Sequence, residues 1–137
     1  MTPRILVLRG RHSPHEELLL AVSTVSGLAY LIGSPPPMSI AALMPRPIVY
    51  IWAIGLLISG AVGLAGCWWR GAYERGIEFE KAGLLIGAGA MLIYGTAAFT
   101  FGGWRALLVG GIVLGWTAAN IIRVAKLQGH LRELSKL

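Results

Sequence analysis

Few residues of this sequence have the types and the spacing that chemistry requires. His12 and His15 lie three positions apart, a spacing that suits a metal ion when both imidazoles project from one face of a helix. Pro14 lies between them at the expected start of a helix, and no third ligand is in register, so we expect no metal site. Cys67 is the only cysteine, which excludes an intrachain disulfide and a zinc site built from thiolates. Because no nucleophile has a base in register and no phosphate-binding loop follows a strand, we predict neither an enzymatic activity nor a cofactor.

The charged residues argue against a nucleic-acid partner. The net charge of +6 and the pI of about 10.1 are compatible with nucleic-acid binding. The basic residues, however, flank apolar stretches of the chain and do not form one continuous patch. Hydrophobic residues make up 55% of the chain and charged residues 13%, which is about half of the charged fraction of a soluble domain. We therefore expect a lipid bilayer as the main partner of the surface.

Four apolar stretches are long enough to cross a bilayer as helices, which takes about 20 residues each. They cover approximately residues 14–33, 48–69, 82–101 and 105–122. The sequence thus predicts an all-α protein with a single transmembrane domain, 1–137, built as an integral membrane four-helix bundle. Ser13, Pro14 and Glu16 have the pattern of a helix start, in which the serine and the glutamate form a capping box.

Two segments allow more than one interpretation. The first apolar stretch follows a basic lead, as a secretory signal peptide does, but Glu16 and Glu17 at its start and three prolines after it favour a retained helix. Residues 38–46 are too short to cross a bilayer and are expected to form an interfacial turn or a re-entrant piece. Because residues 102–104 alone separate the third and fourth stretches, we expect these two to form a tight antiparallel hairpin.

Positive charges predict the orientation, since Lys and Arg accumulate in cytoplasmic segments. The amino-terminal lead, residues 70–81 and the tail 123–137 together hold ten of the twelve positive residues. We therefore predict that both termini are cytoplasmic and that the tail is an amphipathic, basic extension of the fourth helix. Its Arg123, Lys126, Arg132 and Lys136 are the residues we expect to contact an anionic membrane surface or a partner protein.

Small residues recur at intervals of four along the predicted spans. They are Gly55, Ser59 and Gly63 in the second span, Gly83 and Gly87 in the third, and Gly111 and Gly115 in the fourth. Such stripes let helix backbones approach closely in a bilayer. They serve either packing within one bundle or, since three spans carry them, association between copies of the chain.

Strongly polar side chains are scarce within the spans. No Asp, Glu, Lys, Arg or His lies between Leu18 and Gly33, in 48–69 or in 82–104, which argues against a proton-coupled transporter. Asn120 is the one strongly polar side chain inside a span. We interpret it as an interhelical hydrogen-bonding group, with a ligand-binding role as the alternative.

One part of the chain carries a resemblance. The stretch 78–95 (EFEKAGLLIGAGAMLIYG) is followed by Gly102-Gly103-Trp104-Arg105 and a basic helical tail. In these features the second half of the chain resembles small membrane proteins of actinobacterial phages, some of which are holins or holin-like. The resemblance implies a protein that oligomerises and permeabilises the bacterial cytoplasmic membrane.

Three functions follow from the sequence as hypotheses. The leading one is a phage or prophage holin-like protein that forms homo-oligomers. A second is a non-conducting membrane scaffold, accessory subunit or superinfection-exclusion factor that binds other membrane proteins. A third is a channel or transporter for a small neutral solute, whose path would be lined by polar residues of the spans. These residues are Ser23, Thr24, Ser26, Ser59, Thr96 and Asn120.

Overall fold

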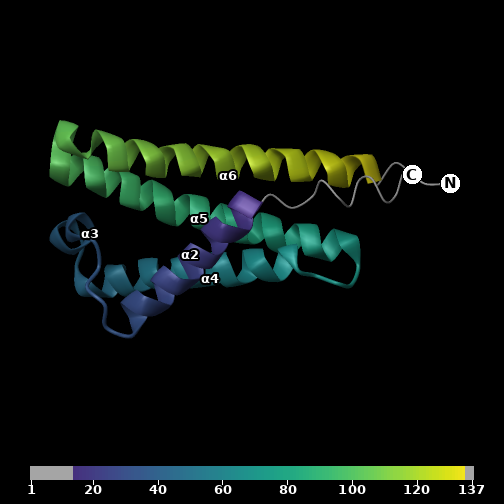
Figure 1. Ribbon diagram of the computed structural model, residues 1–137, viewed down its shortest axis with the longest axis horizontal. Coiled ribbons are helices and arrows are strands. Elements are labelled where there is room, and N and C mark those ends of the chain that lie inside the picture. The colour runs from purple at the N-terminus through teal and green to yellow at the C-terminus, as the bar shows by residue number, and fades with distance from the viewer. Residues whose placement is uncertain (1–13, 135–137) are drawn as a thin grey trace.

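A computed structural model describes residues 14–134, with the side chains of residues 14–132. Within this part of the chain the fold is all-helical, as predicted (Figure 1). Its long helices are α2 (Pro14–Leu31), α4 (Arg46–Cys67), α5 (Tyr73–Gly102) and α6 (Leu107–Leu134). A short helix, α3 (Met38–Leu43), precedes α4, and one 3-10 turn, η1 (Gly103–Ala106), joins α5 to α6. The basic lead, Ser13 and Lys136 lie outside the described residues.

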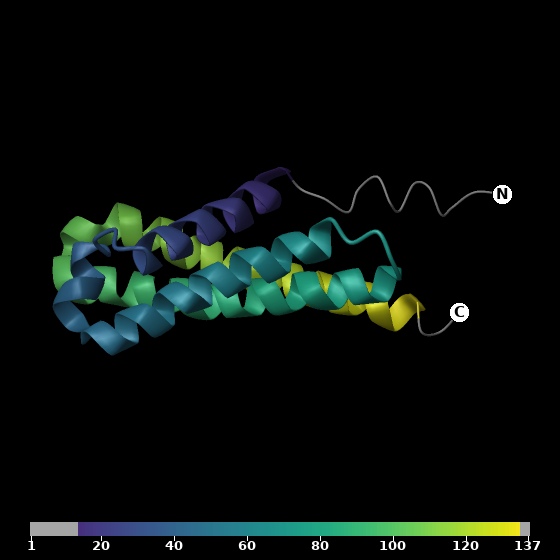
Figure 2. The same ribbon diagram turned by 90° about the horizontal axis from the view of Figure 1, so that it is seen from below.

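The long helices form an open bundle in which each helix packs mainly on its neighbour along the chain. α2 packs on α4, α4 on α5, and α5 on α6. α5 and α6 form the predicted antiparallel hairpin, and Gly103 at its turn has φ +52°, a backbone conformation that glycine adopts at little cost. The beginning of α2, the α4–α5 connection and the end of α6 lie towards one end of the molecule, and α3 and η1 lie at the other (Figures 1 and 2).

Small residues determine how closely the helices approach. A methyl group on Gly83 would collide with the backbone of Gly63, so α4 and α5 meet backbone to backbone at this point. The Ser59 hydroxyl donates a hydrogen bond to the Gly83 carbonyl oxygen at 2.8 Å, and Gly87 lies against the same serine. Four of the seven small residues singled out in the sequence therefore lie in the contact between α4 and α5.

The other three small residues lie elsewhere. A Cβ atom added to Gly55, Gly111 or Gly115 would have no neighbouring atom within 4 Å among the described residues. Gly111 and Gly115 are exposed on α6, on a side of the helix that α5 does not cover. These two glycines therefore take no part in packing within residues 14–134.

Two buried clusters hold the helices together at different levels of the bundle. One contains Ile40 and Trp52, and the other contains Ile77, Leu84 and Leu127. Trp52 links three helices, because its indole stacks on Tyr30 of α2 and its N–H donates to the Ala90 carbonyl of α5 at 2.9 Å. Residues 38–46, expected to form an interfacial turn or a re-entrant piece, form α3 and the start of α4, and Ile40 anchors α3 in the core with none of its surface exposed.

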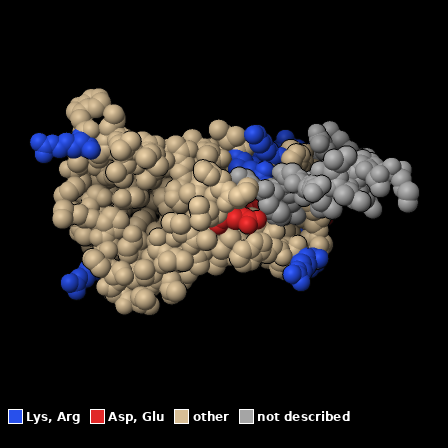
Figure 3. All heavy atoms as spheres, viewed as in Figure 1, with Lys and Arg blue, Asp and Glu red and all other residues tan. Residues whose placement is uncertain are grey.

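Two helical stretches are long and apolar enough to cross a membrane: Arg46–Cys67 and Tyr73–Arg132. The first is α4, whose 22 residues extend roughly 33 Å, close to the thickness of a bilayer core. The second contains α5, η1 and α6, which fold back on each other. On the face shown in Figure 3, Lys and Arg side chains gather towards the two ends of the molecule, and a wide zone between them carries no charge.

Candidate functional site

A cleft of about 230 Å³ opens between α2 and α6, and we call it the α2–α6 cleft. Its floor is the contact between α4 and α5, where Ser59 and Gly87 lie. Because Gly87 has no side chain, the cleft extends down to the backbone of α5 at this point. A Cβ atom there would meet the Ser59 hydroxyl. The cleft exists because α2 packs on α4 and α6 packs on α5, so that the two outer helices face each other across the middle pair.

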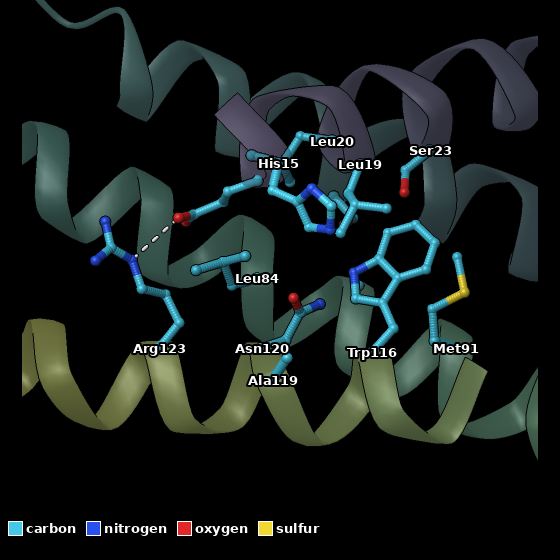
Figure 4. Close-up of a pocket in the computed structure, with 13 residues that line it drawn as sticks. His15, Leu19, Leu20, Ser23, Leu84, Met91, Trp116, Ala119, Asn120 and Arg123 are labelled. Atoms are coloured by element: carbon cyan, nitrogen blue, oxygen red, sulfur yellow. Dashed lines mark ion pairs between the residues drawn. The ribbon is translucent and has the colours of Figure 1, made fainter. Parts of the chain in front are cut away.

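Helical spacing brings the side chains of the cleft to one place, because residues three or four positions apart share a helix face. The lining residues used below are Glu16, Leu20 and Ser23 on α2, and Trp116, Asn120 and Arg123 on α6. Figure 4 shows Arg123 at one end of the cleft, Asn120 near the middle, and Trp116 with Met91 of α5 at the other end. The cleft therefore has a charged end, a polar middle and an apolar end.

Three ionisable side chains from three helices meet at this end, and we call them the charged cluster. The Arg123 Nε atom lies 3.1 Å from the Glu16 Oε2 atom (Figure 4), and Arg123 Nη2 donates a hydrogen bond to Glu80 Oε1, also at 3.1 Å. Glu80 is completely buried, whereas the side chains of Glu16 and Arg123 are 13% and 24% exposed. A guanidinium presents several donors in one plane, so it can bind two carboxylates at once.

The position of Arg123 corrects our expectation from the sequence. We predicted that Arg123 contacts the membrane surface or a partner protein, whereas it pairs with two glutamates of its own chain. The physical reason is that α6 continues eleven residues beyond Arg123, to Leu134, and packs on α5 there. Leu127, in the predicted amphipathic tail, is accordingly buried. Lys126 and Arg132 are exposed, and Lys136 lies outside the described residues.

The sequence also predicted other surroundings for Glu16 and Glu80, the two glutamates of the charged cluster. Glu80 belongs to the polar segment 70–81, which we placed on the cytoplasmic side; α5 begins at Tyr73 and buries Glu80 about two turns inside the helix. Glu16 was expected to complete a capping box with Ser13, which lies outside the described residues. Within the described residues, the Glu16 carboxylate faces Arg123. One signal was available in the sequence: Glu80 precedes Gly83 and Gly87 by three and seven positions, so it shares their packing face.

Two buried polar side chains of the cleft lack hydrogen bonds, Asn120 near its middle and Ser23 towards the end with Trp116 and Met91 (Figure 4). Ser23 is 3% exposed and Asn120 is 8% exposed, and both line the cleft. Within residues 14–134 neither side chain has a hydrogen-bond partner, and the same is true of the Glu16 Oε1 atom. The interhelical hydrogen bond that we predicted for Asn120 is therefore not formed with any described residue. The polar atoms of Ser23 and Asn120 are not sealed from solvent as Glu16 Oε1 is, so they are open to the space of the cleft.

The other residues predicted to line a solute path are placed outside the cleft. Thr24 donates its hydroxyl to the Leu20 carbonyl of its own helix, and Thr96 donates to Leu92 in the same way. Both bonds stay within one helix and satisfy the hydroxyl locally. Among the described residues, no group of three or more His, Cys, Asp or Glu side chains is placed to hold a metal ion.

Comparison of the chain with protein-family models, with curated protein sequences and with solved structures finds no match.

Proposed function

We propose that this chain is a multi-pass protein of the bacterial cytoplasmic membrane that self-associates through α6 and permeabilises that membrane, as holin-like proteins of actinobacterial phages do. The observation that carries the proposal is the exposed Gly111–Gly115 face of α6, which no described part of the chain covers.

The membrane location is supported by length, composition and charge. Two helical stretches satisfy the length and hydropathy that a membrane span needs, and the second of them folds into two antiparallel helices. Large apolar side chains are exposed on these helices, for example Leu108 at 74% and Ile112 at 64%. Lipid chains would cover such side chains without the free-energy cost of exposure to water. The excess of Lys and Arg in the lead, in 70–81 and in the tail supports cytoplasmic termini.

Self-association is supported by the shape of the exposed face of α6. Gly111 and Gly115 are four residues apart, the spacing at which two membrane helices pack closely without side chains between them. The contact between α4 and α5 already contains Ser59, Gly63, Gly83 and Gly87, whereas Gly111 and Gly115 lie outside it. The partner that we propose for this glycine pair is a second copy of α6, and the activity that we propose for the resulting oligomer comes from the resemblance to holin-like proteins.

Controlled expression in a bacterium tests this proposal. Cells that produce the protein should lose their membrane potential, followed with a voltage-sensitive dye, and should release a co-expressed endolysin that cannot cross the membrane by itself. Cells that produce the same amount of an unrelated four-span protein are the control. An intact potential at a good level of membrane-inserted protein would contradict the proposal.

The non-conducting scaffold or subunit remains the alternative of a different class. It would act through the basic tail and residues 70–81, and the exposed Lys126 and Arg132 support a contact there. Native mass measurement in detergent separates the two hypotheses. Homo-oligomers favour the holin-like protein, whereas a monomer or a stable complex with a different protein favours the scaffold.

A second candidate activity is the binding or transport of a small solute, which the α2–α6 cleft favours. Three of the six polar residues predicted to line a path, Ser23, Ser59 and Asn120, lie in this one cleft. A channel or transporter for a neutral solute would use these hydroxyl and amide groups in place of water. Uptake of a radiolabelled polyol into vesicles that contain the protein tests this activity, and uptake equal to that of empty vesicles would exclude it for that solute.

A further inference from the structure

We propose that the α2–α6 cleft binds a small uncharged amphiphile, a molecule with a compact apolar body and one neutral group, such as a primary amide, that both donates and accepts hydrogen bonds. The assignment rests on the small-solute activity proposed above and narrows its ligand from neutral solutes in general to this class. It is independent of membrane permeabilisation. The unpartnered polar groups of the cleft, its balanced charge and its apolar walls together support it.

Two polar side chains without a partner extend into the cleft from its opposite walls. Ser23 of α2 is 3% exposed and Asn120 of α6 is 8% exposed, and neither has a hydrogen-bond partner among the described residues. Both reach into the space between these helices (Figure 4). A carboxamide has two donors and one acceptor oxygen, and a hydroxyl both donates and accepts. A ligand group that also donates and accepts therefore complements both side chains.

The floor of the cleft places a second polar atom close to the Asn120 amide. A Cβ atom on Gly87 would lie 2.5 Å from the Ser59 hydroxyl oxygen and 3.6 Å from the Asn120 amide nitrogen, so both atoms border the space that this glycine leaves. The Ser59 hydroxyl donates its proton to the Gly83 carbonyl, which leaves its oxygen as an acceptor. Donors and acceptors thus lie side by side here, and a primary amide matches them better than a group with only one kind.

The charged side chains that line the cleft favour neither a cation nor an anion. The Glu16 carboxylate and the Arg123 guanidinium face each other at 3.1 Å, so their charges balance. Glu80 is completely buried and lies outside the lining. His15 lines the cleft and is exposed, and its neutral imidazole offers one donor and one acceptor. An ion would lose its hydration in the cleft at a high cost, whereas a neutral polar group has far less hydration to lose.

The remaining walls are apolar and favour a ligand with an apolar body. They are formed by Leu20, Leu84, Met91 and Trp116. Trp116 and Met91 lie at the end of the cleft opposite Arg123 (Figure 4). A polyol would leave these side chains without an apolar partner, whereas an aromatic or aliphatic body would cover them and release the water beside them. The volume of about 230 Å³ is smaller than that of a site for a drug-sized molecule, so it restricts the ligand to a small one.

Four probes of the same planar shape and with different end groups test this assignment. Benzamide is neutral and both donates and accepts, acetophenone is neutral and only accepts, benzoate is an anion and benzamidinium is a cation. Each would be titrated into the unmodified full-length protein in lipid nanodiscs, and the heat in protein-free nanodiscs subtracted. We expect benzamide to bind at least ten times more tightly than either ion and severalfold more tightly than acetophenone. Equal or tighter binding of any other probe, or no binding of benzamide, would overturn the proposal.

The Asn120→Leu variant tests the polar group that we assign to the ligand. Because Asn120 has no hydrogen-bond partner among the described residues, the change should maintain or raise the stability of the fold while it weakens benzamide binding at least tenfold. Gln128→Leu removes a carboxamide from an exposed position of α6 outside the cleft and should leave the affinity unchanged. If the two variants bind benzamide equally well, the ligand does not occupy this cleft and the proposal fails.

The His15→Gln variant separates hydrogen bonding from charge. It keeps a neutral donor and acceptor at the cleft and removes a positive charge that a protonated imidazole would add. We expect the affinity for benzamide to stay nearly unchanged. A tenfold loss would show that the imidazole, and not the neutral groups of Asn120 and Ser23, selects the ligand, and would overturn the assignment.

Binding and transport are measured separately, so failure of this proposal differs from failure of the small-solute activity. Vesicles that take up a polyol although benzamide does not bind would overturn the ligand class and leave transport standing. Benzamide binding without uptake of any solute would support the site and contradict transport.

Discussion

At the scale of single residues, the most informative group is the charged cluster of Glu16, Glu80 and Arg123. Burying an ion pair removes its charges from water, and the attraction between the partners offsets that loss only when the geometry is good. Here Arg123 contacts one carboxylate on α2 and another on α5, so a single side chain connects the two outer helices of the open bundle to its middle. Since α2 and α6 otherwise pack mainly on different helices, we infer that this cluster holds the α2–α6 cleft closed at one end.

Arg123→Met removes the cation and leaves two buried carboxylates facing each other. We expect the free energy of unfolding to fall by about 3 kcal/mol or more, the usual loss when one partner of a buried pair is removed. Lys126→Met makes the same change in charge on an exposed face of α6 and should alter stability by less than about 0.5 kcal/mol. Unfolding in a titration of mixed micelles, followed by circular dichroism, measures both variants. Equal losses would show that the cluster does not stabilise the fold.

The charged cluster could not be predicted from the sequence. Residues three or four positions apart share a helix face, so the spacing of Ser59, Gly63, Gly83 and Gly87 could indicate a close contact. The same periodicity cannot tell which helix a face meets. Glu16 and Arg123 are 107 positions apart in sequence, and their contact depends on how α2 crosses the α4–α5 pair. The local pattern of neither helix contains that crossing, so the sequence predicted a capping box for Glu16 and a membrane-surface or partner contact for Arg123.

At the scale of elements, the contact between α4 and α5 depends on the absence of side chains. Gly63 and Gly83 bring the two backbones together, and the Ser59 hydroxyl bonds to the Gly83 carbonyl across the contact. The helices themselves were predictable, because long uncharged apolar stretches and clear breaks at Pro35 and Gly103 mark their limits. The start of α5 was less predictable from the sequence, because 70–81 is polar in composition although Tyr73 to Lys81 are helical.

Gly83→Leu should separate α4 from α5, because the added side chain has to enter the space of the Gly63 backbone. We expect a loss of about 3 kcal/mol in stability, the upper end of the usual cost of overpacking, or failure to yield a folded protein, because overpacking against backbone cannot be relieved by a change of rotamer. Gly89→Leu is the matched control, since Gly89 is exposed on the same helix and has no neighbouring atom within 4 Å. Resistance to limited proteolysis in detergent compares the two. If both variants resist equally, the close contact is not important for folding.

At the scale of the whole molecule, the proposed topology has four crossings of the membrane with cytoplasmic termini. The two helical stretches that meet the length and hydropathy test do not include α2, whose first turn contains His15, Glu16 and Glu17. The proposed topology includes α2 as the first crossing. Its apolar residues from Leu18 onward and its packing along α4 favour a span.

Cysteine labelling in intact cells tests the topology. In a Cys67→Ser background, Ser34→Cys after α2 should react with a membrane-impermeant maleimide added outside. Gly71→Cys, in the connection between α4 and α5, should react only after the cells are opened. Both positions are exposed in the fold, so a difference in labelling reports the side of the membrane and not burial. Labelling of both positions from the same side would refute the four-span arrangement.

The central claim is that the exposed glycine pair of α6 joins copies of the chain into an assembly that permeabilises the membrane. The most direct measurement is the membrane potential of bacteria that produce equal amounts of the unmodified protein, Gly111→Leu or Gly89→Leu. Both glycines have open space around them within the chain, so neither change should disturb the fold by overpacking. We predict that the unmodified protein and Gly89→Leu collapse the potential, whereas Gly111→Leu preserves it or delays its loss severalfold. An unmodified protein that leaves the potential intact, or a Gly111→Leu variant that collapses it as fast as the unmodified protein does, would contradict the claim.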